Sequence, residues 1–269
     1  MNTSDELVKQ TSGALTEAYR DLVQPTARPI GAIASLLPRT VRLWFGKWER
    51  WVINGEESLE KTAKAIQGKI EGTPEERLSE PDPYVALPAI QQISYCYDSA
   101  ELRDLYANLL ATSMDSAVKN QVHPSYVELI KQLCPDEAKL LASLPHDTVT
   151  LLPVIDLVIE YGGGKGFRTI LRNYSQVGCG VCQCADRAPS YLDNLCRLKL
   201  IEIPEDLHLV DEDNYKPLTE SATIQQLEAD TVLPAGATFE TKKKVIYVTS
   251  FGLGFIQCCV DDYALKRQT

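Results

Sequence analysis

The chain has 269 residues, of which 44% are hydrophobic and 24% are charged, and it contains eight cysteines. This length and composition exclude a disulfide-stapled miniprotein, a fibrous repeat and a disordered chain. The formal net charge of −10 disfavours general binding to nucleic acid, because an acidic protein repels phosphate. The first seven residues lack the basic and apolar pattern of a secretion signal, so we expect a cytoplasmic protein with reduced thiols.

Residues 1–79 have the pattern of an N-terminal amphipathic helical region. One helix of this region places its tryptophans on one face and its arginines on the other. We favour packing, protein contact or self-association for the tryptophan face, and a membrane interface with anionic lipid is the alternative. The interaction surface that we predict consists of five residues, Trp44, Trp48, Trp51, Arg39 and Arg42.

Residues 80–145 have the pattern of a central helical bundle. Ser99 is a predicted N-cap of a helix whose apolar stripe includes the polar residue Asn108. His123 and Pro124 open a second helix, which His123 can cap and whose first turn suits a proline. We expect structural roles for Asn108, His123 and Pro124, because no serine, cysteine or carboxylate stands at a spacing that would make them part of a catalytic set.

Residues 146–269 mix helical and strand patterns. A helix is expected over 188–200, a glycine loop at 162–164, and strand-like segments at 151–159, 201–203, 207–210 and 245–248. This order is typical of a small winged-helix-like α+β module. The fold class that we predict is therefore mostly α, with N-terminal long helices and a central helical bundle followed by that module.

Cysteines cluster at Cys179-x-x-Cys182-x-Cys184, a spacing at which thiolates can converge on zinc. Cys196 or His208 could supply the fourth ligand. A second Cys-x-x-Cys pair is missing, so we favour a reduced loop without a cofactor and keep zinc, or a redox pair of Cys179 and Cys182, as alternatives. The glycines around Lys165 do not have the spacing of a phosphate-binding loop.

Several segments, in order along the chain, resemble the bacterial Abi-alpha (abortive infection alpha) family. They are Tyr19–Pro25, Glu80–Pro83, Glu101-Leu102, Tyr106–Ala111, His123–Tyr126, Leu133–Ala138, Tyr191–Leu195, Leu198–Ile203 and Thr249–Phe255. The resemblance implies an association with abortive infection, a defence against bacteriophage, and brings no catalytic residues or mechanism. Lys199 stands where we expect a glycine, so we predict a helix end without a left-handed cap. The cysteine cluster is no part of the family pattern.

The function that we predict is that of a non-enzymatic antiphage protein acting through protein–protein contacts. No catalytic constellation and no small-molecule substrate are indicated. One alternative is a membrane-interacting effector that uses the tryptophan and arginine helix. The other is a DNA-binding regulator that uses Arg187, Arg197 and Lys199 of the winged-helix-like module, which the acidic residues nearby oppose.

Overall fold

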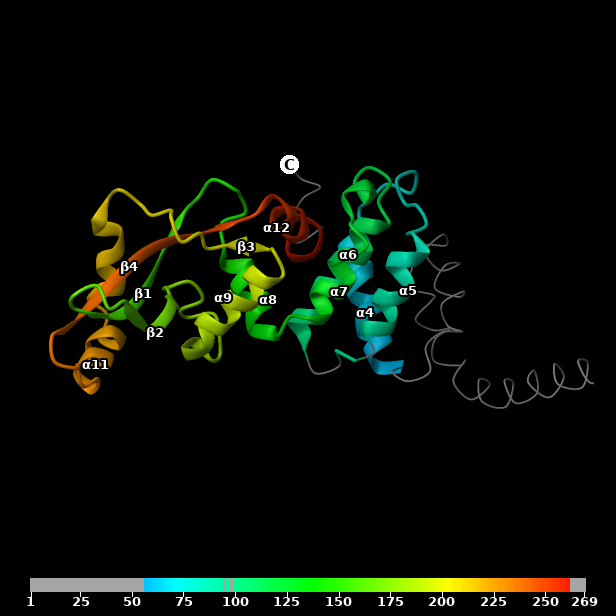
Figure 1. Ribbon diagram of the computed structural model, residues 1–269. Helices are drawn as coiled ribbons and strands as arrows, with labels where there is room; N and C mark the ends of the chain where they lie inside the picture. Colours follow the sequence, from blue (N-terminus) through cyan, green and yellow to red (C-terminus); the bar gives the residue numbers. More distant parts are fainter. Residues whose placement is uncertain (1–55, 94, 97–98, 262–269) are drawn as a thin grey trace, which may run out of the picture. The chain divides into compact units, whose positions relative to one another are not determined.

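The computed structural model describes residues 56–93, 95–96 and 99–261, which form two compact units (Figure 1). The first unit ends at Asn120, and the second spans Gln121–Asp261. The predicted long helices of the N-terminal region, with Trp44, Trp48 and Trp51, lie outside the described residues. The predicted domain boundaries at 79/80 and 145/146 stay predictions.

The first unit is built from α4 (Glu56–Ile70), α5 (Pro83–Ile93) and α6 (Ala100–Ser113), and the short 3-10 helix η2 (Lys119–Gln121) leads out of it. The Ser99 side chain accepts a hydrogen bond from the Leu102 amide, which confirms the predicted N-cap of α6. Apolar side chains from all three helices are buried together, among them Ile66, Ile70, Ile90, Ile93, Leu109 and Leu110. The predicted stripe of α6 is therefore a core face.

The second unit contains a four-stranded antiparallel sheet (Figure 1). Its strands are β1 (Leu152–Tyr161), β2 (Phe167–Tyr174), β3 (Ile201–Glu202) and β4 (Ala237–Val248), in the order β2-β1-β4-β3. The connection between β1 and β2 uses Gly163, Gly164 and Gly166 at φ values of +75° to +86°, a backbone region in which side chains are disfavoured. The predicted glycine loop is thus the turn of a β-hairpin.

One face of the sheet packs against the long connection between β3 and β4. This connection forms η4 (Glu212–Tyr215), α10 (Lys216–Thr219) and α11 (Ala222–Asp230). Ile155 and Leu157 of β1 share a buried cluster with Tyr215, Leu218 and Ile224 of the connection. Side chains alternate between faces along a strand, so Asp156 of β1 lies on the opposite face.

That opposite face carries a buried polar network between the buried apolar side chains of Val154 and Val158. The Lys244 ammonium lies 2.8 and 2.9 Å from the two Asp156 carboxylate oxygens and donates to Asn173 Oδ1 at 2.8 Å. The Asn173 amide donates to Asp156 Oδ1, and its side chain donates to Asp193 Oδ1 of α9. The network joins β1, β2 and β4 to α9, and the buried charges of Lys244 and Asp156 are paired with each other.

Helices α7 (Tyr126–Lys131), α8 (Pro135–Ser143), η3 (Ala185–Arg187), α9 (Ala188–Arg197), α12 (Ser250–Phe255) and the π-helical η5 (Ile256–Val260) complete the second unit. Lys199 adopts φ +60° after α9, and the Leu200 amide donates to the Leu195 carbonyl oxygen at 3.0 Å. The prediction that α9 ends without a left-handed cap is therefore wrong. A lysine takes the position that glycine usually occupies.

The predicted fold class is also wrong, because the described second unit is built on a curled antiparallel sheet and is not winged-helix-like. Residues 207–210 form no strand, and the expected wing is replaced by the helical connection between β3 and β4. Edge strand β2 was missed, since its exposed arginines hide any apolar alternation. The DNA-binding alternative loses the module on which it depended.

Candidate functional site

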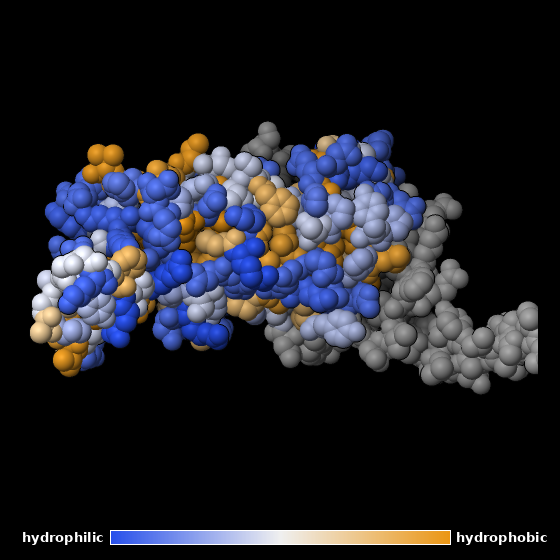
Figure 2. Space-filling view, viewed as in Figure 1, coloured by the Kyte–Doolittle hydropathy of each residue, from blue (hydrophilic) through white to orange (hydrophobic). Residues whose placement is uncertain are grey.

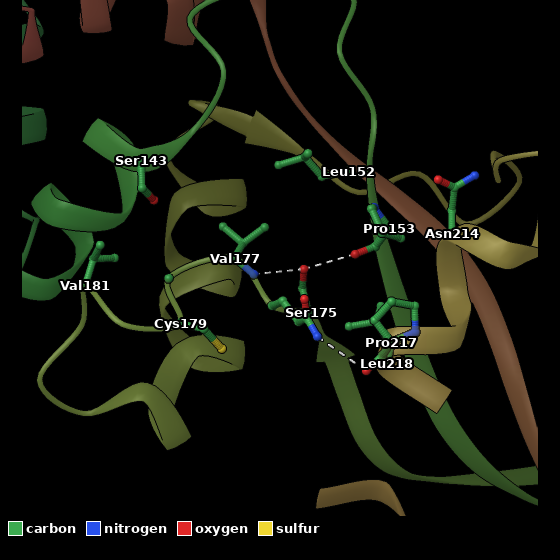
Figure 3. A pocket seen from close by; sticks show the side chains of 12 residues that line it. Ser143, Leu152, Pro153, Ser175, Val177, Cys179, Val181, Asn214, Pro217 and Leu218 are labelled. Carbon is green, nitrogen blue, oxygen red and sulfur yellow. Dashed lines mark hydrogen bonds between the residues drawn. The ribbon is translucent and has the colours of Figure 1, made fainter. Parts of the chain in front are cut away.

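An open cleft of about 400 Å³ lies within the second unit and is formed by four segments of the chain (Figure 3). These are the end of α8, the start of β1, the loop that follows β2, and the η4–α10 junction. The twelve lining residues are Ser143, Leu152, Pro153, Ser175, Gln176, Val177, Gly178, Cys179, Val181, Asn214, Pro217 and Leu218. A volume of this size fits a small ligand or a short apolar segment of a partner.

The polar groups of the cleft are largely engaged with the backbone around them (Figure 3). The Ser175 hydroxyl donates to the Pro153 carbonyl oxygen at 3.0 Å and accepts from the Val177 amide at 3.2 Å. The Ser143 hydroxyl donates to the Leu140 carbonyl oxygen, and the Gln176 side-chain amide donates to the Pro217 carbonyl oxygen. These bonds fix the walls and leave apolar side chains as the main contact area.

The lining contains no histidine, carboxylate, lysine or arginine. Its nucleophilic side chains are the exposed thiol of Cys179 and the Ser143 and Ser175 hydroxyls, which both donate to backbone carbonyl oxygens. A cysteine nucleophile needs a base or a positive neighbour to form the thiolate, and the lining residues offer neither. The cleft is therefore arranged for binding rather than for acid–base chemistry.

A second hollow, of about 340 Å³, lies around the first turn of α8 and is built on Asp136. The Asp136 carboxylate accepts hydrogen bonds from the amides of Gln183 and Cys184, at 2.9 and 3.0 Å, and from the Tyr191 hydroxyl. The hydrogen bonds from the two amides hold the pKa of Asp136 below its usual value. Burial, together with the smaller effect of the hydrogen bond to Asp136, raises the pKa of Tyr191 to about 12. Asp136 thus acts as a structural clamp on the loop that carries the cysteines.

The structure does not bring the predicted zinc ligands together. Within the described ranges, no group of three or more histidine, cysteine or acidic side chains could hold a metal ion. Cys179 and Cys184 are exposed, while Cys182 and Cys196 are half-buried. Burial raises the pKa of Cys182 and raises that of Cys196 to about 11, which disfavours the thiolates that a metal requires.

The residues predicted to have structural roles are found in helical surroundings. Asn108 is fully buried in α6 of the first unit. In the second unit, the exposed His123 accepts a hydrogen bond from the Ser125 amide through Nδ1, and its ring lies 5.8 Å from that of Tyr126. Pro124 is exposed and lies in the turn that leads into α7. None of these three residues lines either hollow.

Sequence reasoning missed the cleft, apart from Cys179. The lining residues come from segments separated by up to about seventy residues, and most of them are ordinary apolar or small polar residues. Elsewhere on the visible face of this unit, hydrophobic groups stand apart on a mostly hydrophilic surface (Figure 2). Isolated apolar residues are normal on a protein surface, whereas a concave apolar site suggests binding.

No helix in the described part of the chain is long and apolar enough to cross a membrane.

Comparison with known proteins identifies one family. The family model described as Abortive infection alpha matches residues 54–259, about three quarters of the chain. The match includes the whole cleft and every sequence segment on which the resemblance depended except Tyr19–Pro25. No curated protein and no solved structure matches the chain.

Proposed function

Because the chain belongs to the abortive infection alpha family, we propose that it is an antiphage protein that acts without catalysis, by binding a protein partner in the cleft. The observation that carries this proposal is the chemistry of the cleft walls. Twelve residues line the cleft, and Cys179 is the one ionisable side chain among them. Such walls suit apolar side chains of a partner and supply no general acid or base.

Specificity in this cleft comes from shape and from a few fixed polar groups. Leu152, Val177, Val181 and Pro217 provide apolar contact from three directions, and the Asn214 side chain lies at the η4 side. The Asn214 amide group donates to the Asp211 carbonyl oxygen at 3.0 Å, which holds the side chain in place. A short segment with one or two apolar side chains and little charge is the occupant that these walls favour.

The test is phage plaque formation in cells that carry the intact gene or a single valine-to-aspartate variant. Val181 lines the cleft and is 41% exposed, so Val181→Asp introduces a charge into the apolar site with little effect on folding. Val210, which is 95% exposed and lies outside the cleft, provides the matched control Val210→Asp. We expect the intact gene and Val210→Asp to lower plaque counts while infected cells die, and Val181→Asp to lose this protection.

Two results would contradict the proposal in different ways. If Val181→Asp protects as well as the intact gene, then the cleft is not the working surface. If the intact gene protects against no phage in a broad panel, the defence function itself fails. The predicted Trp44, Trp48 and Trp51 surface is a second contact surface that we propose from the sequence, and Trp44→Ala with Trp48→Ala tests it in the same assay.

A further inference from the structure

A buried lysine amine and a buried carboxamide face each other in the second unit. Lys244 of β4 and Asn173 of β2 are both buried, and the Lys244 Nζ atom lies 2.8 Å from Asn173 Oδ1. Because a C=O bond is about 1.2 Å long, the Asn173 Cγ atom lies within about 4 Å of Nζ. Groups held about 3–3.5 Å apart are placed to react, so the two side chains are close to a reactive arrangement.

Asp156 of β1 lies beside this amine and can accept a proton from it. Its two carboxylate oxygens are 2.8 and 2.9 Å from Lys244 Nζ, and its side chain is buried as well. In a site removed from water, transfer of a proton from the ammonium to the carboxylate replaces two charges by two neutral groups, which need less solvation. The transfer frees the electron pair that a nucleophilic amine requires. The exposed Glu205 lies farther from Nζ, at 3.8 Å, so Asp156 is the nearer acceptor.

Specific contacts hold the Asn173 side chain in its orientation. Its Nδ2 group donates to Asp193 Oδ1 of α9 at 2.7 Å, and its backbone amide donates to Asp156 Oδ1 at 2.8 Å. Asn173 also has φ +53°, a conformation that asparagine tolerates better than most residues. Oδ1 therefore faces the amine, and Nδ2 faces α9. Asp193 is exposed, so Nδ2 lies on the side of the network from which ammonia can leave.

We propose that Lys244 and Asn173 form an intramolecular amide bond, an isopeptide bond, with Asp156 as the proton acceptor. The ion pair and hydrogen bonds described above are the state of these residues before the reaction. Asn173 is the electrophile rather than Asp156, because an ionised carboxylate accepts protons but resists nucleophilic attack. The inference is independent of the proposed function, since it concerns a covalent change within the purified chain.

The reaction balances with these three side chains alone. The Lys244 ammonium transfers one proton to Asp156, and the neutral amine attacks Asn173 Cγ, so that an N–C bond forms while the carbonyl electron pair moves to Oδ1. A second proton passes from the attacking nitrogen to Nδ2, the C=O bond re-forms, and the bond between Cγ and Nδ2 breaks. The lysine amine and the asparagine amide thus become one new amide and one ammonia molecule, and Asp156 keeps the first proton.

The bond has a consequence for the sheet. It joins β2 to β4, which are not neighbours, because β1 lies between them. The two bonded residues are 71 positions apart, and the loop that the bond closes contains α9, β3 and the helical connection between β3 and β4. A cross-link restricts the unfolded chain, and its effect grows with the length of the closed loop. The cross-linked chain should therefore unfold at a higher urea concentration than the same chain without the bond.

The experiment measures the intact mass of the purified full chain after incubation in the folded state. We expect the natural chain to be lighter than its sequence by one ammonia molecule, and its digest to contain one peptide pair joined through Lys244 and Asn173. Lys244→Arg keeps the charge without a primary amine, and Asn173→Gly suits φ +53° without a side-chain amide, so both variants should have the mass of their sequence. Lys243→Arg, at the neighbouring and more exposed lysine, is the matched control that still loses ammonia.

A further variant tests the proton acceptor. Asp156→Asn should lower the rate of ammonia loss after synthesis by about 10²–10⁴-fold, the usual contribution of a positioned proton acceptor. The proposal is overturned if the folded natural chain keeps the full mass of its sequence. Loss of ammonia that maps to the Asn173 peptide alone indicates a cyclic imide and would also overturn it. Loss of water, with a bond between Lys244 and Asp156, would overturn the assignment to Asn173.

Discussion

Replacing Lys244 tests whether the buried polar network stabilises the second unit. The Lys244 side chain is 2% exposed and that of Asp156 is 7% exposed, so both charges are removed from water. In Lys244→Met, the Asp156 carboxylate loses its ammonium partner and keeps the amide of Asn173 as a donor. Breaking a buried pair by removing one partner costs about 3–5 kcal/mol, because the remaining charge stays buried.

The assay is urea unfolding followed by far-UV circular dichroism, with hydrogen exchange of the β1 and β4 amides to report on the second unit alone. With an m-value of about 2 kcal/mol/M, a loss of about 3–5 kcal/mol lowers the midpoint by about 1.5–2.5 M. Lys243→Ala is the control, because the Lys243–Glu212 ion pair joins side chains that are 27% and 74% exposed. Such a pair contributes at most about 1 kcal/mol.

A double variant separates the charge effect from the loss of packing. Lys244→Met with Asp156→Asn removes both charges of this pair, and the asparagine side chain can still accept a hydrogen bond from the Asn173 amide. We expect this variant to be more stable than Lys244→Met alone by at least about 1 kcal/mol. The reasoning is refuted if Lys244→Met loses no more stability than Lys243→Ala, or if the double variant is no more stable than the single one.

Three further predictions concern backbone geometry and pH. Gly252→Ala should destabilise the second unit by about 1–3 kcal/mol in urea unfolding, because its Cβ would lie 1.9 Å from the Leu200 carbonyl oxygen; an unchanged midpoint would contradict this. Lys199→Gly should raise the melting temperature, because glycine adopts φ +60° without strain. The expected gain in the free energy of unfolding is about 1 kcal/mol, and Lys199→Ala should not produce it. The lowered pKa of Asp136 makes its carboxylate stabilising above its unfolded-state pKa of about 3.9, and this contribution is lost as the pH falls through the lower folded-state value. Asp136→Asn should therefore lower the urea midpoint at pH 7. Between pH 5 and pH 3 the midpoint of this variant should fall less than that of the natural protein. Equal falls in the two proteins would contradict a stabilising role of the ionised Asp136 carboxylate.

Local sequence patterns predicted α6 and α9 correctly, whereas α5, α10 and α11 were not predicted. The Ser99 cap and the proline in the first turn of α8 act within one helical turn, so their effects are independent of the rest of the fold. The order of short motifs along the chain likewise identified the abortive infection alpha family, since a family resemblance needs no structure. The residues around Ile201 and Val245 were correctly expected in strands, because their apolar alternation is local as well.

Strand pairing and the functional surfaces were decided by the tertiary structure. The run Lys242–Lys244 interrupts the alternation of β4, and Lys244 is buried only because folding brings Asp156 and Asn173 to it from 88 and 71 residues away. The cleft likewise needs four separate segments, and nothing in one segment indicates the others. The zinc hypothesis depended on spacing, which places thiols close along the chain but does not decide the directions of their side chains. The sequence by itself thus determined helices such as α6 and α9 and the family, whereas long-range contacts decided the sheet, the helical connection between β3 and β4, and the cleft.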